Sequence, residues 1–402
     1  MAASVMLMMP AAALAAPPAR ISLPEPTGAR PVGSVTLHLV DRDRADPWRK
    51  DRRRELMVTV TYPARATGRH ERAAWLPDGV AAAVHTFMKL PENSVAWDRT
   101  KRHAYDSAAV DRRGGPKPVV LFSPGLNVPR ELDTVLTDDL ASRGYVVVSI
   151  SHTYETLAVQ FPGDRVERML PADLTPAYAE KATETRVADT RFVLDRLAAL
   201  NAGTNPDAER RPLPSGLSGA LDLGQVGMFG HSLGGFTAGE AMYRDRRIDA
   251  GVNMDGGMAY GDPTGTDYRP GKVAEHGLDR PFMLMGSAPV NKETGELNEH
   301  NHLPGGPDRS WRDFWSHQRG WKRDLTLLKA AHNSFTDLQT VVPQLGALIP
   351  EQDGVIGTID PGRSLAAQRT YLASFFDLHL RHRNNHLLDG PSPKYPEIKF
   401  VK

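Results

Sequence analysis

The stretch VGMFGHSLGGFTAGEAM, residues 226–242, decides the fold of this chain. It starts with an apolar run, which is typical of a strand buried on both faces. The turn that follows matches the pattern G-x-S-x-G around Ser232, and a helix of small residues comes after the turn. The pattern alone is weak, because glycine and serine are common residues. Its place between a strand and a helix makes Ser232 the candidate nucleophile.

Seven further segments have the pattern of strands, and helical segments alternate with them along the chain. The strands are expected at residues 35–40, 56–62, 119–122, 145–150, 248–254, 281–285 and 325–328. Helices are expected at residues 130–143, 180–200 and 364–381. Strands that alternate with helices form a mostly parallel sheet that is covered on both faces. The sequence predicts an α/β-hydrolase fold, with a mostly parallel eight-stranded sheet and helices on both faces.

Two long segments interrupt this alternation. Residues 63–117 show no clear sheet pattern, although a short helix is expected near residues 80–90. Residues 290–322 form a second irregular insertion. Because no linker separates two folding units, we expect residues 17–402 to form one domain that carries both insertions.

The first residues have the composition of a targeting segment rather than of a fold. Residues 5–16 are apolar and rich in alanine, and Ala13-Leu14-Ala15 is a small-x-small site typical of signal-peptide cleavage. We therefore predict a signal peptide at residues 1–16 and a secreted protein. No lysine or arginine precedes Arg20, so an alanine-rich tail on a cytoplasmic protein is the alternative. No later apolar run approaches 20 residues, so we expect no membrane span.

Composition excludes several classes of function. The 402 residues include 49 basic and 48 acidic side chains, which gives a net charge of +1. A nearly neutral chain argues against a nucleic-acid partner. The chain has no cysteine, which excludes a cysteine nucleophile, disulfides and thiolate metal sites. Composition leaves the oligomeric state open.

A serine nucleophile requires a base, and the base requires an acid that orients it. In this architecture the acid and then the histidine follow the serine along the chain. Asp255 fits the acid because it directly follows a strand, with Asp262 and Glu293 as alternatives. His332 fits the base because it follows the last predicted strand of the sheet.

An oxyanion hole needs backbone amides close to the serine. One is expected from the residue after the nucleophile, Leu233, and the other from the loop at residues 124–127. Gly125 allows this loop to approach closely, so the amide of Leu126 is the second candidate donor.

These residues resemble the plasma-type platelet-activating-factor acetylhydrolase family, in its branch of secreted bacterial lipases and esterases. The resemblance rests on FSPGL at residues 122–126, GHSLGG at 230–235, Asp255, and AHNSFTD at 331–337. It implies an α/β-hydrolase that cleaves short or oxidised acyl esters without a metal or organic cofactor. It also implies that the acid follows soon after the serine, which favours Asp255.

Aromatic residues in and near the second insertion suggest a substrate pocket. Trp311, Phe314 and Trp315 share one face of a predicted helix. Trp311, Trp315 and Phe335 are therefore candidate pocket residues, although packing of this helical face on the core is the competing interpretation. The His300-Asn301-His302 segment and the histidines at 379, 382 and 386 are interpreted as solvated, with no metal site.

The sequence thus predicts a serine hydrolase that acts on short-to-medium acyl esters or on phospholipid acyl groups. A polyester hydrolase, an amidase and a catalytically silent binding protein remain alternatives. The expected partners are a small-molecule, lipid or polyester substrate, with at most transient contact with a lipid interface.

Overall fold

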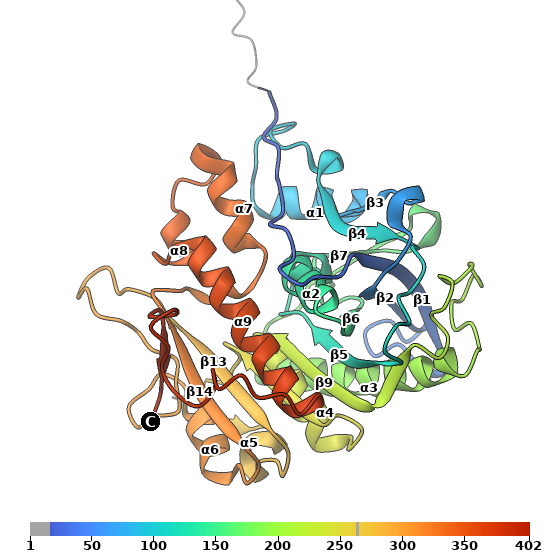
Figure 1. The fold of residues 1–402 in the computed structure, drawn as a ribbon. Helices are drawn as coiled ribbons and strands as arrows, with labels where there is room; N and C mark the ends of the chain where they lie inside the picture. The colour runs from blue at the N-terminus through green and yellow to red at the C-terminus, as the bar shows by residue number, and fades with distance from the viewer. Residues whose placement is uncertain (1–16, 263–264) are drawn as a thin grey trace, which may run out of the picture.

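A central sheet of eleven strands runs through the computed structural model, which describes residues 17–262 and 265–402 (Figure 1). Across the sheet the strand order is β15-β14-β13-β10-β9-β5-β6-β2-β1-β4-β3. Its strands are β1 (Val32–Ala45), β2 (Arg53–Pro63), β3 (Arg72–Ala74), β4 (Lys101–Asp106), β5 (Lys117–Ser123), β6 (Val146–Ser151), β9 (Leu221–His231), β10 (Ala250–Met254), β13 (Phe282–Ala288), β14 (Lys322–Leu328) and β15 (Ile398–Phe400). Two separate ribbons pair β7 (Ala158–Gln160) with β8 (Val166–Arg168), and β11 (Ala259–Tyr260) with β12 (Arg269–Pro270).

All eight predicted strands are present in the sheet, but the prediction of eight strands in total is wrong. Strands β3 and β4 lie in the first insertion, where no sheet pattern was recognised, and β15 lies at the carboxyl end of the chain. All three are at or next to a sheet edge. Edge strands are short and carry charged residues, so they lack the apolar runs of central strands.

The middle of the sheet is parallel, and this brings several strand ends to one edge. Strands β6, β5, β9, β10, β13 and β14 pair in parallel in that order. Strands β1 and β2 form a long antiparallel pair beside them, and β15 runs antiparallel to β14. Ligands in open α/β sheets bind beyond the carboxyl ends of the parallel strands. Ser232 follows β9, Asp255 follows β10 and His332 follows β14, so all three lie at this edge.

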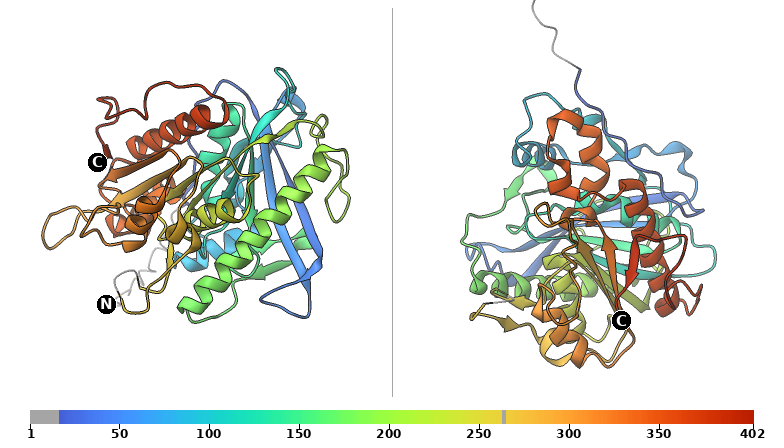
Figure 2. Two further views of the ribbon diagram at one scale, coloured as in Figure 1. Left: turned by 90° about the horizontal axis from the view of Figure 1, so that it is seen from below. Right: turned by 90° about the vertical axis from the view of Figure 1, so that its left-hand side faces the viewer.

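Helices cover both faces of the sheet, as predicted. They are α1 (Asp78–Phe87), α2 (Thr134–Ser142), α3 (Pro176–Asn201), α4 (Leu233–Arg244), α5 (Lys272–His276), α6 (Arg309–His317), α7 (Leu338–Leu345), α8 (Gln352–Ile356) and α9 (Pro361–Leu380). Figure 2 shows the green helix α3 and the red helix α9 on opposite sides of the sheet. Among the described residues, no helix is both long enough and apolar enough to cross a bilayer.

The alternation of side chains along the central strands builds two hydrophobic cores. In β5, Val120 and Phe122 join a cluster with residues of α2 and α9. Val119 and Leu121 point the other way and join a cluster with residues of α3 and α4. Because successive side chains of a strand face opposite sides, a continuous apolar run fits a strand that is covered twice. The predicted signal peptide, residues 1–16, lies outside the described residues.

Candidate active site

Ser232 occupies a strained turn between β9 and α4. Its backbone angles are φ 55° and ψ −126°, a region that residues with side chains rarely adopt. The flanking glycines make the turn possible. A Cβ atom on Gly230 would lie 2.2 Å from the carbonyl oxygen of Gly234, and one on Gly234 would lie 1.9 Å from that of Ser123. The structure thus gives the reason for glycine at both positions of the sequence pattern.

Asp255 and His332 meet at the same sheet edge. The Nδ1–H of His332 donates a hydrogen bond of 2.6 Å to Oδ2 of Asp255. The amide of Ser232 donates to the carbonyl of Met254 at 2.9 Å, which ties the serine turn to the end of the strand that carries Asp255. The His332 side chain is 49 % exposed, whereas the carboxylate of Asp255 is almost fully buried. The histidine is therefore accessible from solvent while its acidic partner is shielded.

The structure favours Asp255 over the alternative acids. Asp262 and Glu293 are both exposed in loops. Burial would raise the pKa of the Asp255 carboxyl, but hydrogen bonds from His300 and His332 hold it far below its usual value. Its Oδ1 atom also accepts the amide of Ser287 at 2.7 Å. Asp255 is thus stabilised as a carboxylate by three hydrogen-bond donors around it.

His300 is a neighbour of Asp255 that the sequence interpretation missed. It was expected in a solvated loop, but its side chain is only 14 % exposed, and its Nδ1–H donates to Oδ1 of Asp255 at 2.8 Å. A signal for this contact was present in β13, where Gly286 interrupts an apolar run. A Cβ atom at Gly286 would lie 1.9 Å from the carbonyl oxygen of His300. An isolated glycine within a strand often marks such a close backbone approach.

The predicted oxyanion loop lies against the serine. A Cβ atom on Gly125 would lie 3.4 Å from Cβ of Ser232, so the loop passes close to the nucleophile. Leu233 is the first residue of α4, where backbone amides have no partner within the helix. Among the described residues, no hydrogen bond is recorded for the amides of Leu126 and Leu233. Both candidate donors are therefore available to a ligand.

Arg186 of α3 holds the oxyanion loop from its buried side. Its guanidinium donates to the carbonyl of Pro124 at 2.6 Å and to that of Gly125 at 3.4 Å. Because the C=O and N–H of one peptide point in opposite directions, the amides of Gly125 and Leu126 face away from Arg186. The Nε–H of Arg186 also donates to Glu155 at 2.7 Å.

A second Ser–His–Asp chain lies beneath this loop. Ser123 contacts Nε2 of His152 at 3.0 Å, and Nδ1 of His152 contacts Asp189 at 2.9 Å. Burial lowers the pKa of His152 to about 4, so the ring is neutral and its Nε2 accepts a hydrogen bond from the Ser123 hydroxyl. All three side chains are buried without solvent access, whereas Ser232 is partly exposed. The buried chain therefore cannot meet a substrate.

An apolar cavity of about 340 Å³ opens beside the oxyanion loop and the loop of His332. Its lining comes from α1, the oxyanion loop, the 3₁₀ helix at His332–Phe335, α7 and α8. It is lined by Phe87, Met88, Leu126, Asn127, Val128, Leu132, Leu157, Asn333, Leu338, Val342, Ile349 and Val355. The cavity thus brings the first predicted insertion, through Phe87 and Met88, beside the oxyanion loop and the loop of His332.

The predicted pocket residues lie elsewhere. Trp311 and Phe335 are fully buried in the hydrophobic clusters, and neither they nor Trp315 line the apolar cavity. The Trp311 ring stacks on His300 with 3.9 Å between ring centroids, and the Trp315 ring stacks on His302 at 3.9 Å. Trp311 packs on the core as part of the apolar face of α6, and Phe335 is buried in the 3₁₀ helix at His332–Phe335, so neither contributes to the wall of this cavity.

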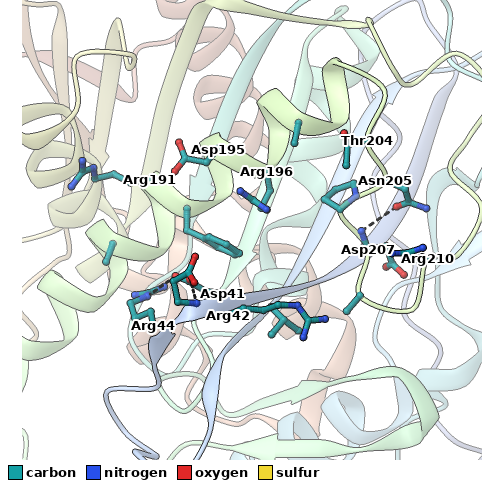
Figure 3. Close-up of a pocket in the computed structure, with 17 residues that line it drawn as sticks. Asp41, Arg42, Arg44, Arg191, Asp195, Arg196, Thr204, Asn205, Asp207 and Arg210 are labelled. Carbon is teal, nitrogen blue, oxygen red and sulfur yellow. Dashed lines mark hydrogen bonds and ion pairs between the residues drawn. The ribbon is translucent and has the colours of Figure 1, made fainter.

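Other predicted features lie away from the serine. His302 is also buried rather than solvated, and it contacts Asp324 at 2.6 Å. His379 packs edge-on against Trp321, whereas His386 contacts Asp389 in the exposed loop that follows α9. A separate hollow between β1 and α3 is lined largely by arginine and aspartate side chains and contains no residue of the candidate site (Figure 3).

Comparisons with known proteins identify the family of this chain and its relatives. The model of the family described as "Platelet-activating factor acetylhydrolase, isoform II" matches residues 18–392. A probable 1-alkyl-2-acetylglycerophosphocholine esterase from Arthroderma benhamiae is 30 % identical, over 96 % of this chain and 95 % of its own. A platelet-activating factor acetylhydrolase from Gallus gallus is 20 % identical, over 80 % of this chain and 79 % of its own.

A solved structure extends the comparison to the fold. The ferulic acid esterase from Streptomyces cinnamoneus superposes with a TM-score of 0.75 at 35 % identity, covering 95 % of this chain and 99 % of that one. The family match, the esterase relatives and this neighbour together confirm the α/β-hydrolase fold and a carboxylic ester hydrolase. The chain belongs to the platelet-activating factor acetylhydrolase, isoform II, family.

Proposed function

We propose that this chain is a secreted serine esterase in which Ser232 is the nucleophile, His332 the base and Asp255 the acid. The hydrogen bond of 2.6 Å between His332 and the buried carboxylate of Asp255 carries the proposal. In this hydrogen bond Nδ1 of His332 faces the acid, so Nε2 is the ring nitrogen left to exchange protons. The strained backbone of Ser232 and its closeness to the Gly125 loop add support.

The chemistry divides into two half-reactions. The Ser232 oxygen attacks the ester carbonyl carbon, its proton passes to His332, and the carbonyl π electrons move to oxygen. The amides of Leu126 and Leu233 bind this oxyanion. The intermediate then expels the alcohol, which takes the proton from His332. Water, deprotonated by His332, attacks the acyl-enzyme. The carboxylic acid product then leaves as Ser232 regains its proton from His332.

The apolar cavity beside Leu126 is proposed to bind the acyl group. Its volume of about 340 Å³ and its apolar lining suit a short-to-medium acyl chain, as in short-chain esters or phospholipid acyl groups. The names of the relatives point to the acetyl ester of an alkyl glycerophosphocholine as one such substrate.

A second candidate substrate class follows from the solved neighbour. Because the neighbour is named as a ferulic acid esterase, a hydroxycinnamoyl ester is a rival for the same cavity. The polar side chains of Asn127 and Asn333 within the apolar lining offer partners for a phenolic hydroxyl. Hydrolysis rates rank these substrates. The series to compare is the p-nitrophenyl esters of acetate, butyrate, octanoate and palmitate, methyl ferulate, and an alkyl acetyl glycerophosphocholine.

Export is also part of the proposal and rests on the sequence of residues 1–16. Ala19 already donates to the carbonyl of Ser94 at 2.7 Å, so cleavage after Ala15 or Ala16 leaves the described contacts in place. Mass spectrometry of the mature amino terminus, after expression of the full chain in a secreting host, tests this. A protein found only in the cytoplasm with residues 1–16 intact contradicts it.

A fluorophosphonate probe tests the nucleophile. We expect it to label Ser232, and Ser232→Ala to abolish both labelling and hydrolysis of p-nitrophenyl butyrate while the protein stays folded. Ser123→Ala is the matched control, because Ser123 belongs to the other Ser–His–Asp chain. Labelling of Ser232 should persist in that variant. Folded protein that resists the probe would instead favour a silent binding protein.

A further inference from the structure

We propose that His300 is a positioning residue that holds Asp255 for His332, so that the relay extends from His332 through Asp255 and His300 to Asp308. The inference rests on the proposed function, because it concerns the acid of the proposed triad. His300 comes from the second insertion, within the loop that joins β13 to α6.

Both ring nitrogens of His300 face carboxylate oxygens. Nδ1 lies 2.8 Å from Oδ1 of Asp255, and Nε2 lies 3.1 Å from Oδ2 of Asp308. A carboxylate accepts hydrogen bonds, so both nitrogens must carry protons and the ring is an imidazolium. Burial would lower the pKa of His300, but the two carboxylates raise it to about 10.

The surrounding structure fixes the position of this imidazolium. Its ring stacks on Trp311, and its backbone N–H donates to the carbonyl of Ser287 at 2.9 Å. The N–H of Ser287 in turn donates to Oδ1 of Asp255. Asp308 caps the amino end of α6 by accepting from the amide of Ser310 at 2.8 Å. One residue of β13, Ser287, therefore binds both partners of the His300–Asp255 contact, Asp255 through its N–H and His300 through its C=O.

This arrangement has a steric consequence for the acid. Oδ1 of Asp255 is occupied by Ser287 and His300, so Oδ2 is left for His332. A carboxylate held on one side cannot rotate away from its histidine. Loss of the His300 contact should therefore lower kcat more than it changes KM.

The arrangement also has an electrostatic consequence. The charged and titratable groups around His300 are Asp255, Asp308, Asp324 and, across the Asp255 carboxylate, His332. A positive charge on the far side of Asp255 opposes protonation of His332. The rate rises with pH, and His300 should therefore shift the midpoint of this pH–rate profile toward lower pH.

His300→Gln tests both consequences, because glutamine can donate a hydrogen bond but carries no charge. We expect kcat to fall about tenfold and the midpoint of the pH–rate profile to rise by roughly one unit. Asp308→Asn removes a negative charge while keeping a good helix cap. It should shift the midpoint in the opposite direction, because the charge of His300 is then less compensated.

His302→Gln is the matched control. His302 is also buried, stacks on a tryptophan at the same centroid distance and contacts one aspartate, Asp324, but the structure gives it no contact with Asp255. The proposal predicts a wild-type midpoint for this variant. An unchanged midpoint in folded His300→Gln protein, or an equal shift in both glutamine variants, overturns the proposal.

Two further variants distinguish a failure of the proposal from a failure of the protein to fold. If His300→Gln does not fold, Asp308→Asn decides: a lowered midpoint supports the relay, and an unchanged one overturns it. Ser232→Ala is assayed in parallel. Full activity in Ser232→Ala overturns the proposed function, whereas an inactive Ser232→Ala with a wild-type profile in His300→Gln overturns only the role of His300.

Discussion

The guanidinium of Arg186 lies 2.6 Å from the carbonyl oxygen of Pro124, so a buried side chain of α3 supports the loop that carries the Leu126 amide. A rigid oxyanion hole stabilises the developing charge without reorganisation during the reaction. Position and rigidity of this loop thus depend on a residue that no substrate touches.

The first prediction concerns this support. Arg186→Met should lower kcat about 100-fold with a smaller change in KM, and Arg186→Lys should recover part of the loss. Arg54→Met is the control, because Arg54 is equally buried in the same charge network but pairs with Asp46 and Asp189 instead of the loop. Steady-state kinetics on the folded fraction checks both. Equal losses of kcat in the two methionine variants would refute a specific role for Arg186.

The second prediction concerns the serine turn. Gly234→Ala should destabilise the protein by roughly 1–3 kcal/mol, because its new methyl group meets the Ser123 carbonyl. It should also lower kcat about 100-fold by displacing Ser232. Gly354→Ala, within α8 and with open space around it, should instead stabilise the protein by about 0.5–1 kcal/mol. Urea unfolding distinguishes these outcomes, and similar stabilities for the two variants would contradict the clash.

The third prediction concerns the buried carboxyl of Asp133, which has no hydrogen-bond partner among the described residues. Burial, and then repulsion from Asp337, raise its pKa well above the usual value. The folded protein therefore retains a proton that the unfolded chain releases above a pKa of about 3.9. Above that pH this group should lower the free energy of unfolding of the wild type by about 1.4 kcal/mol per pH unit, until the pKa of Asp133 in the folded state is passed.

Asp133→Asn removes this titration. It should raise the free energy of unfolding more at pH 7 than at pH 5, as measured by urea unfolding across that range. Asp98→Asn, at an exposed position, should show no such trend. If Asp133→Asn raised the free energy of unfolding by the same amount at every pH, the result would count against a raised pKa of Asp133.

The fourth prediction concerns the apolar cavity. Leu157→Trp places bulk at a half-buried wall, so kcat/KM should fall roughly tenfold more for the octanoate ester than for the acetate ester. Leu174→Trp changes an exposed leucine and should leave the ratio unaltered. If Leu157→Trp lowered kcat/KM equally for both esters, the acyl group would not bind in this cavity.

The features predicted from sequence were those with a local physical signature. Central strands need apolar runs because both faces are covered, and the serine turn needs glycines at fixed positions. The order of serine, acid and histidine along the chain then identified Ser232, Asp255 and His332, which the structure brings to one edge of the sheet. Their catalytic roles stay predictions until the serine is labelled.

The features missed depend on contacts between distant segments. Strand β4, with the sequence KRHAYD, pairs near a sheet edge, where burial of Arg102 and Ala104 gives only a weak alternation. The role of His300 depends on how a long loop folds back over Gly286. The aromatic face of α6 has the same pattern whether it lines a pocket or the core, so sequence periodicity could not decide between them.

The insertion that supplies His300 has an implication for protein engineering. Loops of this kind tolerate changes in length and sequence more readily than the sheet that they cover. An enzyme whose proton-transfer partner is tuned from such a loop can have its working pH adjusted by grafting a different loop. The nucleophile, the base and the acid would stay as they are, and relatives with other insertions would supply the variants to screen.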